Sequence, residues 1–203
     1  MIWPPPDQPL EGSIVRLEPI SKRHARGLTG AASETEIWAW MDRTISGGKA
    51  HFRGWLEDRL EGRHAGEEWG YAILRRGSVV GSTSFLHPRP DHDGVEIGWT
   101  WLHPTAWRTG ANVEAKLLML GQAFETLGCI RVEFKTDARN KRSRNALSAL
   151  PANFEGIQRK HMRIPGLGVR DSAIFSIVDD DWPQVRANLA RRLAAGDREH
   201  ALA

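Results

Sequence analysis

Residues 107–116, WRTGANVEAK, stand immediately before LLMLGQAFETLG (117–128), and together they predict a glycine-containing turn that opens a long helix. Five apolar residues recur on one face of that helix: Val113, Leu117, Leu120, Phe124 and Leu127. Gly128 suits the position that follows the last turn. The first N–H groups of a helix have no partner within it. The turn is therefore either a plain helix start or a binding site for a negatively charged group.

The composition favours a globular protein of one domain. The chain has 203 residues, of which 40% are hydrophobic and 26% charged, and its net charge is +3. This mild basicity is compatible with an anionic ligand but does not by itself indicate nucleic acid. Cys129 is the single cysteine, so no intramolecular disulfide can form, and we expect it to be a buried structural thiol.

The first nine residues, MIWPPPDQP, predict an extended N-terminal arm, because three prolines favour a stiff conformation. They have neither the basic segment nor the apolar segment of a signal peptide. No apolar run reaches the length needed to cross a bilayer. We therefore expect a cytoplasmic protein that does not insert into membranes.

Outward from the quoted turn, the spacing of apolar residues predicts alternating strands and helices. Strands are expected at 13–18, 69–75, 78–87, 95–103, 130–136, 154–162 and 172–178. Helices are expected at 21–32, 34–40, 50–62, after Gly110, from Asn140 to Leu150, and from Asp179 or Asp180 onward. The glycines at 46–48 separate two of these helices, and loops are expected at 87–94 and 164–171. The pattern predicts one mixed α/β domain (α+β) over 10–195, with a mostly antiparallel sheet and a tail at 196–203.

Two common phosphate-binding loops are excluded, because the chain has no GxxxxGK[ST] motif and no GxGxxG motif after a strand. Arg108 nevertheless lies beside the turn. Four further cations follow the next strand: Arg139, Lys141, Arg142 and Arg144. If the two strands are neighbours, these cations and both helix starts form a concentrated anion site. The alternative is that the run RNKRSR (139–144) is a solvated basic surface.

Several motifs in register resemble the GNAT superfamily of acyl-CoA-dependent N-acetyltransferases. They are EIGWTW, WRTGANVEAKLLML, AFETLGCIRVEFKTDARNKRS, FEGIQRKH and RDSAIFSIV. More narrowly, they resemble the branch that contains the ribosomal-protein N-terminal acetyltransferases. The likeness extends from about Leu10 to the C-terminal helix. It implies a twisted sheet with helices on both faces and a splay between the fourth and fifth strands.

The resemblance implies where acetyl-CoA would bind. The family holds the pyrophosphate on the main chain of a turn that corresponds here to Trp107, Arg108, Thr109, Gly110, Ala111 and Asn112. Gly110 matches the family pattern, whereas Trp107 and Asn112 do not. The pantetheine arm would pair with the end of the preceding strand, at Thr100, Trp101, Leu102 and His103. Asn140 and Ser143 match an N-x-x-S motif beside the thioester. No metal ion is implied.

The same resemblance offers candidates for the chemistry. Glu96 would be the general base, acting through water, or else a surface or ion-paired glutamate. Ser143 would donate a hydrogen bond to the departing sulfur, or else be an ordinary polar residue in a first helical turn. The single tyrosine, Tyr71, lies far in sequence from the family's proton donor. Met162 stands where ribosomal-protein acetylating relatives can carry a glutamate, and Pro151 replaces a family glycine.

Trp38 and Trp40 lie in the segment that forms the acceptor pocket in this family, although tryptophans are equally expected in a core. The loop HPRPDHD (87–93) contains two histidines and two aspartates without a recognisable metal-ligand spacing, so we expect it to be solvated.

The resemblance therefore implies an acetyl-CoA-dependent N-acetyltransferase that acts on a primary amine, either a protein N-terminus or a small molecule, in a ternary complex. Relatives are often homodimers. Two alternatives remain open at this point. The chain could be a CoA-binding or regulatory domain without efficient catalysis. It could also be a basic module that binds ribosomes or nucleic acid through RNKRSR, although nucleic acid is the less expected partner.

Overall fold

Strands from the whole chain form one sheet in a computed structural model, which describes residues 1–41 and 49–196. The expected glycine break at 46–48 and most of the expected tail lie outside these ranges. The strands are β1 (Leu10–Glu11), β2 (Arg16–Pro19), β3 (Glu68–Arg75), β4 (Ser78–Arg89), β5 (Gly94–Leu102), β6 (Arg131–Asp137), β7 (Asn153–Ile164) and β8 (Gly168–Val178). Their order in the sheet is β1-β2-β3-β4-β5-β6-β8-β7.

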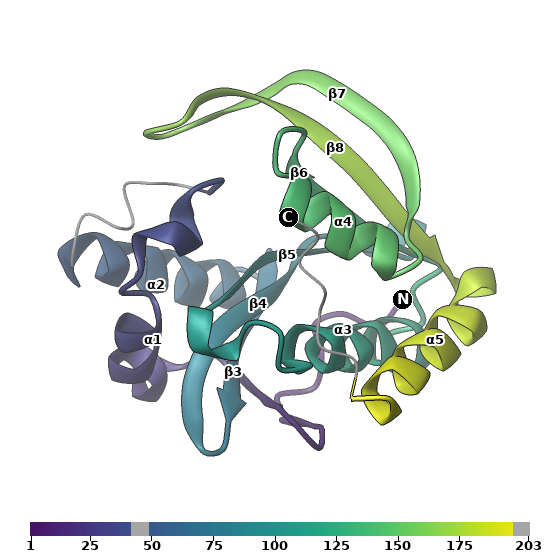
Figure 1. The fold of residues 1–203 in the computed structure, drawn as a ribbon, viewed down its shortest axis with the longest axis horizontal. Helices are drawn as coiled ribbons and strands as arrows, with labels where there is room; N and C mark the ends of the chain where they lie inside the picture. The colour runs from purple at the N-terminus through teal and green to yellow at the C-terminus, as the bar shows by residue number, and fades with distance from the viewer. Residues whose placement is uncertain (42–48, 197–203) are drawn as a thin grey trace.

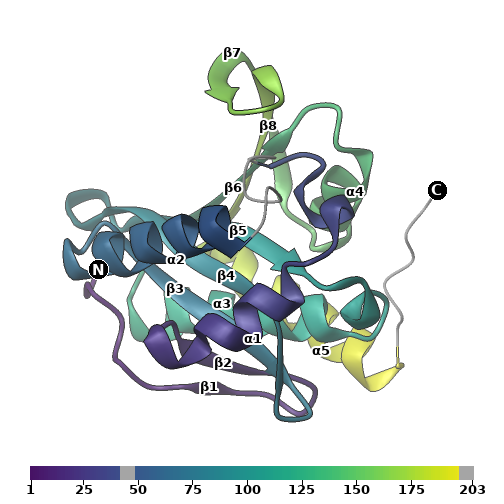
Figure 2. The ribbon, with the colours of Figure 1, turned by 90° about the vertical axis from the view of Figure 1, so that its left-hand side faces the viewer.

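The helices are α1 (Ala25–Ala31), α2 (Lys49–His64), α3 (Ala111–Gly121), α4 (Lys141–Ala149) and α5 (Trp182–Ala194). Short helical turns join them: η1 (Lys22–His24), η2 (Thr35–Trp38), η4 (Pro90–His92), η5 (Pro104–Ala106), η6 (Gln122–Thr126) and η7 (Asp179–Asp181). Figure 2 shows α1 and α2 on one face of the sheet and α3 and α5 on the other. The expectation of a mixed α/β sheet with helices on both faces is confirmed.

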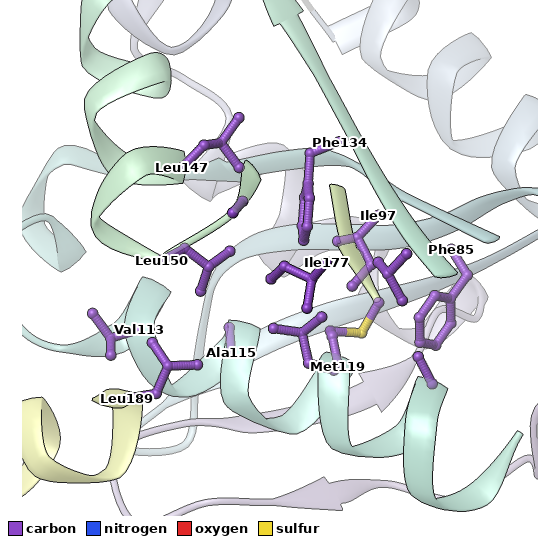
Figure 3. Close-up of a cluster of buried hydrophobic side chains, with 14 of the residues drawn as sticks. Phe85, Ile97, Val113, Ala115, Met119, Phe134, Leu147, Leu150, Ile177 and Leu189 are labelled. Atoms are coloured by element: carbon purple, nitrogen blue, oxygen red, sulfur yellow. The ribbon is translucent and has the colours of Figure 1, made fainter. Parts of the chain in front are cut away.

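Each face of the sheet has its own hydrophobic cluster. The larger cluster joins α3, α5 and the inner ends of β5, β6 and β8, with Met119, Phe134, Ile177 and Leu189 buried (Figure 3). The smaller one packs α1, η2 and α2 against the opposite face around Trp38, Trp55 and Trp101. Because both faces are covered, burial of apolar area stabilises the sheet on both sides.

Several sequence-based boundaries are corrected by the structure. The expected loop at 87–94 is mostly strand and a short helical turn, since β4 runs to Arg89. The expected loop at 164–171 is also wrong, because β8 begins at Gly168 and the hairpin turn is only 165–167. The strand expected at 13–18 is β2, which begins at Arg16, a further strand, β1, precedes it at Leu10–Glu11, and the helix expected at 34–40 is the 3-10 turn η2.

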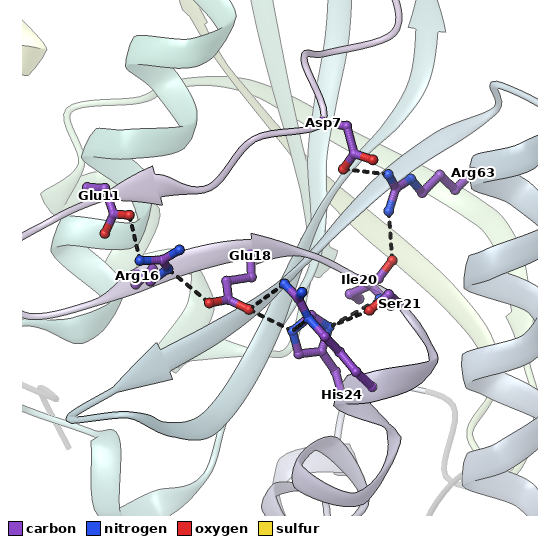
Figure 4. A network of polar contacts seen from close by, with 9 residues as sticks. Asp7, Glu11, Arg16, Glu18, Ile20, Ser21, His24 and Arg63 are labelled. Carbon is purple, nitrogen blue, oxygen red and sulfur yellow. Dashed lines mark hydrogen bonds and ion pairs between the residues drawn. The ribbon is translucent and has the colours of Figure 1, made fainter.

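The N-terminal arm lies against the domain. Trp3 Nε1 donates to the Gly66 carbonyl at 2.7 Å, and Asp7 pairs with Arg63 at 2.7 Å. Figure 4 shows Arg63 also reaching the Ile20 carbonyl and Glu18 in contact with His24. Glu18 also accepts a hydrogen bond from Arg23. These contacts hold the start of the chain and β2 onto α2 and η1, so we assign this network a structural role.

Candidate active site

The strands β5 and β6 run parallel only over three residue pairs, Gly94–Arg131, Val95–Val132 and Glu96–Glu133. Beyond Glu96 the two strands no longer pair with each other, which confirms the expected splay. A cleft of about 1150 Å³ opens there, lined by β5, β6, α3, α4, α5, η2 and the β7–β8 hairpin. In Figure 1 the curved hairpin arches over one side of this region. A cleft of this size suits an extended cosubstrate and an acceptor.

One end of the cleft is the turn that opens α3. Gly110 is the N-cap residue, has φ +82°, and offers no side-chain hydrogen bond to the helix. The Thr109 hydroxyl donates to the Ala106 carbonyl instead, at 2.7 Å. Glu114 is buried and accepts hydrogen bonds from Ser13, Ile14 and Val15. Neither Thr109 nor Glu114 caps α3 with its side chain, and Gly110 has no side chain. The positive end of the helix dipole therefore remains available to an anion.

Gly110 is required by the backbone rather than by the cleft. A Cβ atom there would lie 2.8 Å from Ile14 Cδ1, and the left-handed φ is unfavourable for other residues. Gly110, Thr109 and Ala111 do not line the cleft with their side chains, whereas Trp107, Arg108 and Asn112 do.

Trp107 has a structural explanation that the sequence did not reveal. Its indole Nε1 donates to the Leu102 carbonyl at 2.8 Å and ties the turn to the end of β5. The Arg142 guanidinium lies over the Trp107 ring, 4.2 Å from its centroid. Trp107 thus joins the turn, the strand end and the first turn of α4.

The basic residues of the run 139–144 make different contacts. Arg139 forms an ion pair with Asp137 at 2.8 Å, and the Arg144 guanidinium donates to the Ala138 carbonyl. Arg142 lines the cleft, as Arg108 does, whereas Lys141 is exposed outside it. Only part of the predicted basic cluster therefore faces the anion site.

The unpaired edge of β5 forms one wall. Thr100, Trp101 and Leu102 line the cleft, whereas the His103 N–H donates to the Val80 carbonyl and His103 lies outside it. The Thr100 hydroxyl accepts from the buried Lys116 Nζ at 2.7 Å. On its other side β5 pairs with β4, so only the cleft-facing edge can receive an extended ligand.

Glu96 lies at the point where β5 and β6 part, and it is only 4% exposed. Lys135 Nζ lies 2.8 Å from Glu96 Oε2 as an ion pair, although this oxygen has no partner of good hydrogen-bond geometry among the described residues. His87 Nε2 lies 3.8 Å from the same oxygen. Glu96 lines the cleft, so it is an ion-paired glutamate and also accessible to a ligand.

A β-bulge follows Glu96. The register of β4 and β5 shifts between Ser82 and Ser84, and Trp99 has φ +47°, which is rare for a bulky residue. Arg59 lies over the Trp99 ring at 4.9 Å and pairs with Glu68 at 3.0 Å. Burial raises the pKa of Glu68 to about 7, and Arg59 opposes that rise. Packing from α2 thus holds a strained backbone at the cleft wall.

Asn140 and Ser143 both line the cleft at the start of α4. The Asn140 side-chain oxygen accepts from the Ser143 N–H at 3.1 Å, which confirms the predicted helix cap. Tyr71 is fully buried beside Phe85, and burial raises the pKa of its hydroxyl far above the ordinary value. Tyr71 therefore cannot supply a proton to the cleft.

The two candidate acceptor tryptophans are separated by the structure. Trp40 lines the cleft, and Arg139 lies 5.5 Å from its ring. Trp38 is 1% exposed, belongs to the hydrophobic core and donates its indole N–H to the Ala32 carbonyl. Cys129 is buried, and burial raises the pKa of its thiol to about 11.

Within residues 1–41 and 49–196, no group of three His, Cys, Asp or Glu residues is placed to hold a metal ion. No helix in the same ranges is both long and apolar enough to cross a membrane.

Several cleft residues were not singled out in the sequence. They are Trp99, Lys116, Lys135, Arg170 and Arg192. Arg170 was hidden by its assignment to a loop, and Lys116 resembles a surface residue of an amphipathic helix. Only the three-dimensional path of β8 and α3 brings them to the cleft.

The comparisons with known proteins agree with this architecture. Residues 15–151 match the model of an acetyltransferase (GNAT) domain. The chain belongs to the GNAT acetyltransferase family. No curated protein sequence matches it.

Solved structures extend the likeness over nearly the whole chain. A protein of T. thermophilus described as an acetyltransferase has 36% identity and a TM-score of 0.84, covering 95% of this chain and 100% of that one. A GCN5-related N-acetyltransferase from Brucella melitensis has 29% identity and a TM-score of 0.87, covering 98% and 93%. Mycobacterium smegmatis RimJ, solved with CoA-disulfide, shares the fold at 20% identity and a TM-score of 0.77, covering 94% of each chain.

Proposed function

We propose that this GNAT acetyltransferase transfers an acetyl group from acetyl-CoA directly to a primary amine within a ternary complex. One observation carries the proposal: a single cleft joins a helix start with a glycine N-cap to a buried carboxylate. Arg108 and Asn112 line it beside that helix start, and Glu96 lies where β5 and β6 part.

The residues of the cleft fit the cosubstrate. The first N–H groups of α3, with Arg108 and Arg142, would bind the pyrophosphate, because they combine a helix dipole with two cations. The free edge of β5 at Thr100–Leu102 would pair with the pantetheine amides. The likeness to RimJ supports the same fold for the acceptor side of the cleft, and the acceptor class follows from the residues of the cleft.

The chemistry requires a neutral amine. Glu96 would accept a proton from the acceptor ammonium, through water, and Lys135 Nζ lies 2.8 Å from Glu96 Oε2 as its ion-pair partner. The neutral amine nitrogen then forms a bond to the acetyl carbon, the carbon–sulfur bond breaks, and the proton that the nitrogen loses passes through water to the departing thiolate, which leaves as free thiol. A main-chain N–H at the bulge beside Trp99 would stabilise the oxyanion.

The departing sulfur needs a hydrogen-bond donor. Ser143 would supply that bond, because its side chain lines the cleft at the start of α4. A serine hydroxyl is a weak acid, so the positioning of amine and thioester would account for most of the rate.

Ligand binding and turnover test the proposal separately. Acetyl-CoA at 100 times its Kd should stabilise the fold by about 2.7 kcal/mol, seen as a rise in melting temperature. Release of free thiol with a panel of primary amines should follow. A rise in melting temperature without thiol release for any amine would favour a CoA-binding regulatory domain. Salt-dependent RNA binding without a response to acetyl-CoA would favour the nucleic-acid alternative.

A further inference from the structure

Among the described residues, Arg170 is a cation of the cleft without a carboxylate partner. It lies on β8 opposite Met162 of β7, and both side chains line the cleft. Its Nε donates to the Ser172 hydroxyl at 2.9 Å. Within the part of the chain that the structure describes, no carboxylate lies within ion-pair distance of its guanidinium. The two terminal nitrogens of Arg170 are therefore available to a ligand.

The two carboxylates whose charges act on Arg170, Glu96 and Asp137, already form ion pairs with other cations. Glu96 pairs with Lys135 at 2.8 Å. Asp137 accepts from the side chain of Arg139 at 2.9 and 2.8 Å. Since each of these carboxylates pairs with another cation, Arg170 adds a positive charge that no ion pair within the described residues neutralises.

The neighbouring histidine does not change this balance. His161 Nδ1 lies 2.9 Å from the Ser172 hydroxyl, and burial together with Lys135 and Arg170 holds the pKa of His161 below its usual value. His161 is therefore uncharged near neutral pH. Burial also lowers the pKa of Arg170, but a guanidinium stays protonated at any pH of interest.

The cleft as a whole has an excess of positively charged side chains. Of the residues that the structure describes, two carboxylates line it, Glu36 and Glu96. Six cations from the same ranges line it: Arg108, Lys116, Lys135, Arg142, Arg170 and Arg192. Arg108 and Arg142 are assigned to the pyrophosphate and Lys135 pairs with Glu96, and the remaining positive charge disfavours acceptors that carry several positive charges, such as polyamines. Trp40, Met41 and Met162 add apolar surface for the remainder of an acceptor.

We propose that the acceptor is an amine that carries a carboxylate a few bonds from its amino group, and that Arg170 binds this carboxylate. The inference rests on the proposed function and specifies its substrate class. A guanidinium binds a carboxylate with two parallel hydrogen bonds, which fixes the direction of the acceptor. Because Arg170 and Glu96 line the same cleft, an acceptor with its carboxylate at Arg170 would present its amine to Glu96.

Matched pairs of acceptors test the proposal. Thiol release is measured with acetyl-CoA and phenylalanine, methionine or glutamate, each against its α-amide, and with spermidine. Peptide amides that begin with Asp or with Asn form a further arm, which separates an acidic N-terminus from a free amino acid. The carboxylate-bearing member of at least one pair should show about 10- to 100-fold higher kcat/KM, since a hydrogen bond to a charged group contributes about 1.5–3 kcal/mol.

Arg170→Gln should remove this preference. We expect KM for the carboxylate-bearing acceptor to rise about 10- to 100-fold, whereas kinetics with its amide change less than about 3-fold. Arg163→Gln is the matched control, because Arg163 lies on the same hairpin, is exposed and does not line the cleft. Arg170→Lys should restore part of the preference by returning the charge without the planar fork.

The outcomes separate this inference from the proposed function. Equal or faster acetylation of amides or spermidine would overturn the role of Arg170 while leaving the acetyltransferase proposal intact. An unchanged carboxylate preference in Arg170→Gln would also overturn it. Absence of any acetyl-CoA effect on the melting temperature would instead reject the proposed function, and the inference with it.

Discussion

The two ends of the cleft are built in different ways. The end at α3 presents main-chain N–H groups, and Gly110 at its centre has no side chain to contribute. The end at Glu96 presents charged side chains: Glu96 pairs with Lys135 of β6, and Arg170 lies on the neighbouring strand β8 without a carboxylate partner among the described residues. A site made of backbone tolerates changes in residue type, whereas a site made of side chains does not. We therefore expect substitutions at the Glu96 end to have the larger effects.

The largest expected effect is that of Glu96→Gln. Loss of a general base should lower kcat by about 10²- to 10⁴-fold, because general base catalysis typically contributes that factor. The measurement is thiol release at saturating acetyl-CoA across a pH series. Binding of acetyl-CoA, followed by thermal shift, should persist because Glu96 lies at the other end of the cleft.

Glu133→Gln provides the matched control for Glu96. Glu133 is the register partner of Glu96 on β6 but pairs with Arg89 and Arg131 and does not line the cleft. Its kcat should stay within about 3-fold of the wild type. A Glu96→Gln enzyme with wild-type kcat at every pH would contradict the assignment of Glu96 as base and weaken the contrast between the two ends.

The second prediction concerns the hydrogen bonds that hold α3, the helix at the backbone-built end of the cleft, to residues 13–15. Glu114 is 4% exposed and accepts four hydrogen bonds from Ser13, Ile14 and Val15. Glu114→Gln should lower the free energy of unfolding by about 2–4 kcal/mol, because the amide cannot accept all of these bonds and places a donor among donors. Denaturant unfolding measures it. Exposed Glu125, changed in the same way, should shift stability by less than about 1 kcal/mol.

The contrast also shows how far the sequence alone can lead. The Gly110 turn, the Asn140 cap and the place of Arg108 beside the turn follow from local patterns, which depend on neighbours along the chain, whereas Glu96 and Ser143 were indicated by the family resemblance. Trp38 and Trp40 stand two residues apart, yet one is core and the other lines the cleft. The local sequence does not indicate which tryptophan is buried in the core and which lines the cleft, because that depends on how η2 packs on α2.

Arg170 and Gly110 illustrate a different limit. Arg170 follows a glycine-rich segment that indicates a loop, and its place in the cleft depends on the pairing of β8 with β7. The presence of glycine at position 110 correctly indicated a turn, but the sequence did not show why glycine is needed there. Its φ and the approach of Ile14 require glycine, so Gly110→Asp should strain the fold as well as weaken the anion site.

The third prediction probes the backbone-built end through its exposed charge. Arg108→Glu should raise KM for acetyl-CoA about 3- to 10-fold and leave kcat nearly unchanged, because an exposed charge contributes modestly in water. Raising the salt concentration should narrow the difference. Lys141→Glu is the control, since Lys141 is an exposed cation of the same basic region outside the cleft. Equal effects of the two variants would indicate general attraction rather than a site at the turn.

The smallest effect is expected at Ser143, which lines the cleft in the first turn of α4. Ser143→Ala should lower kcat less than about 10-fold, because a serine hydroxyl is a poor acid and can offer only one hydrogen bond to sulfur. The helix should be unaffected, since Asn140 caps it through the main-chain N–H of Ser143, which alanine retains. Single-turnover kinetics would separate the chemical step from product release. A decrease of about 10³-fold or more would instead place essential proton transfer at Ser143, and the side-chain chemistry of the cleft would then extend to α4 as well as to Glu96.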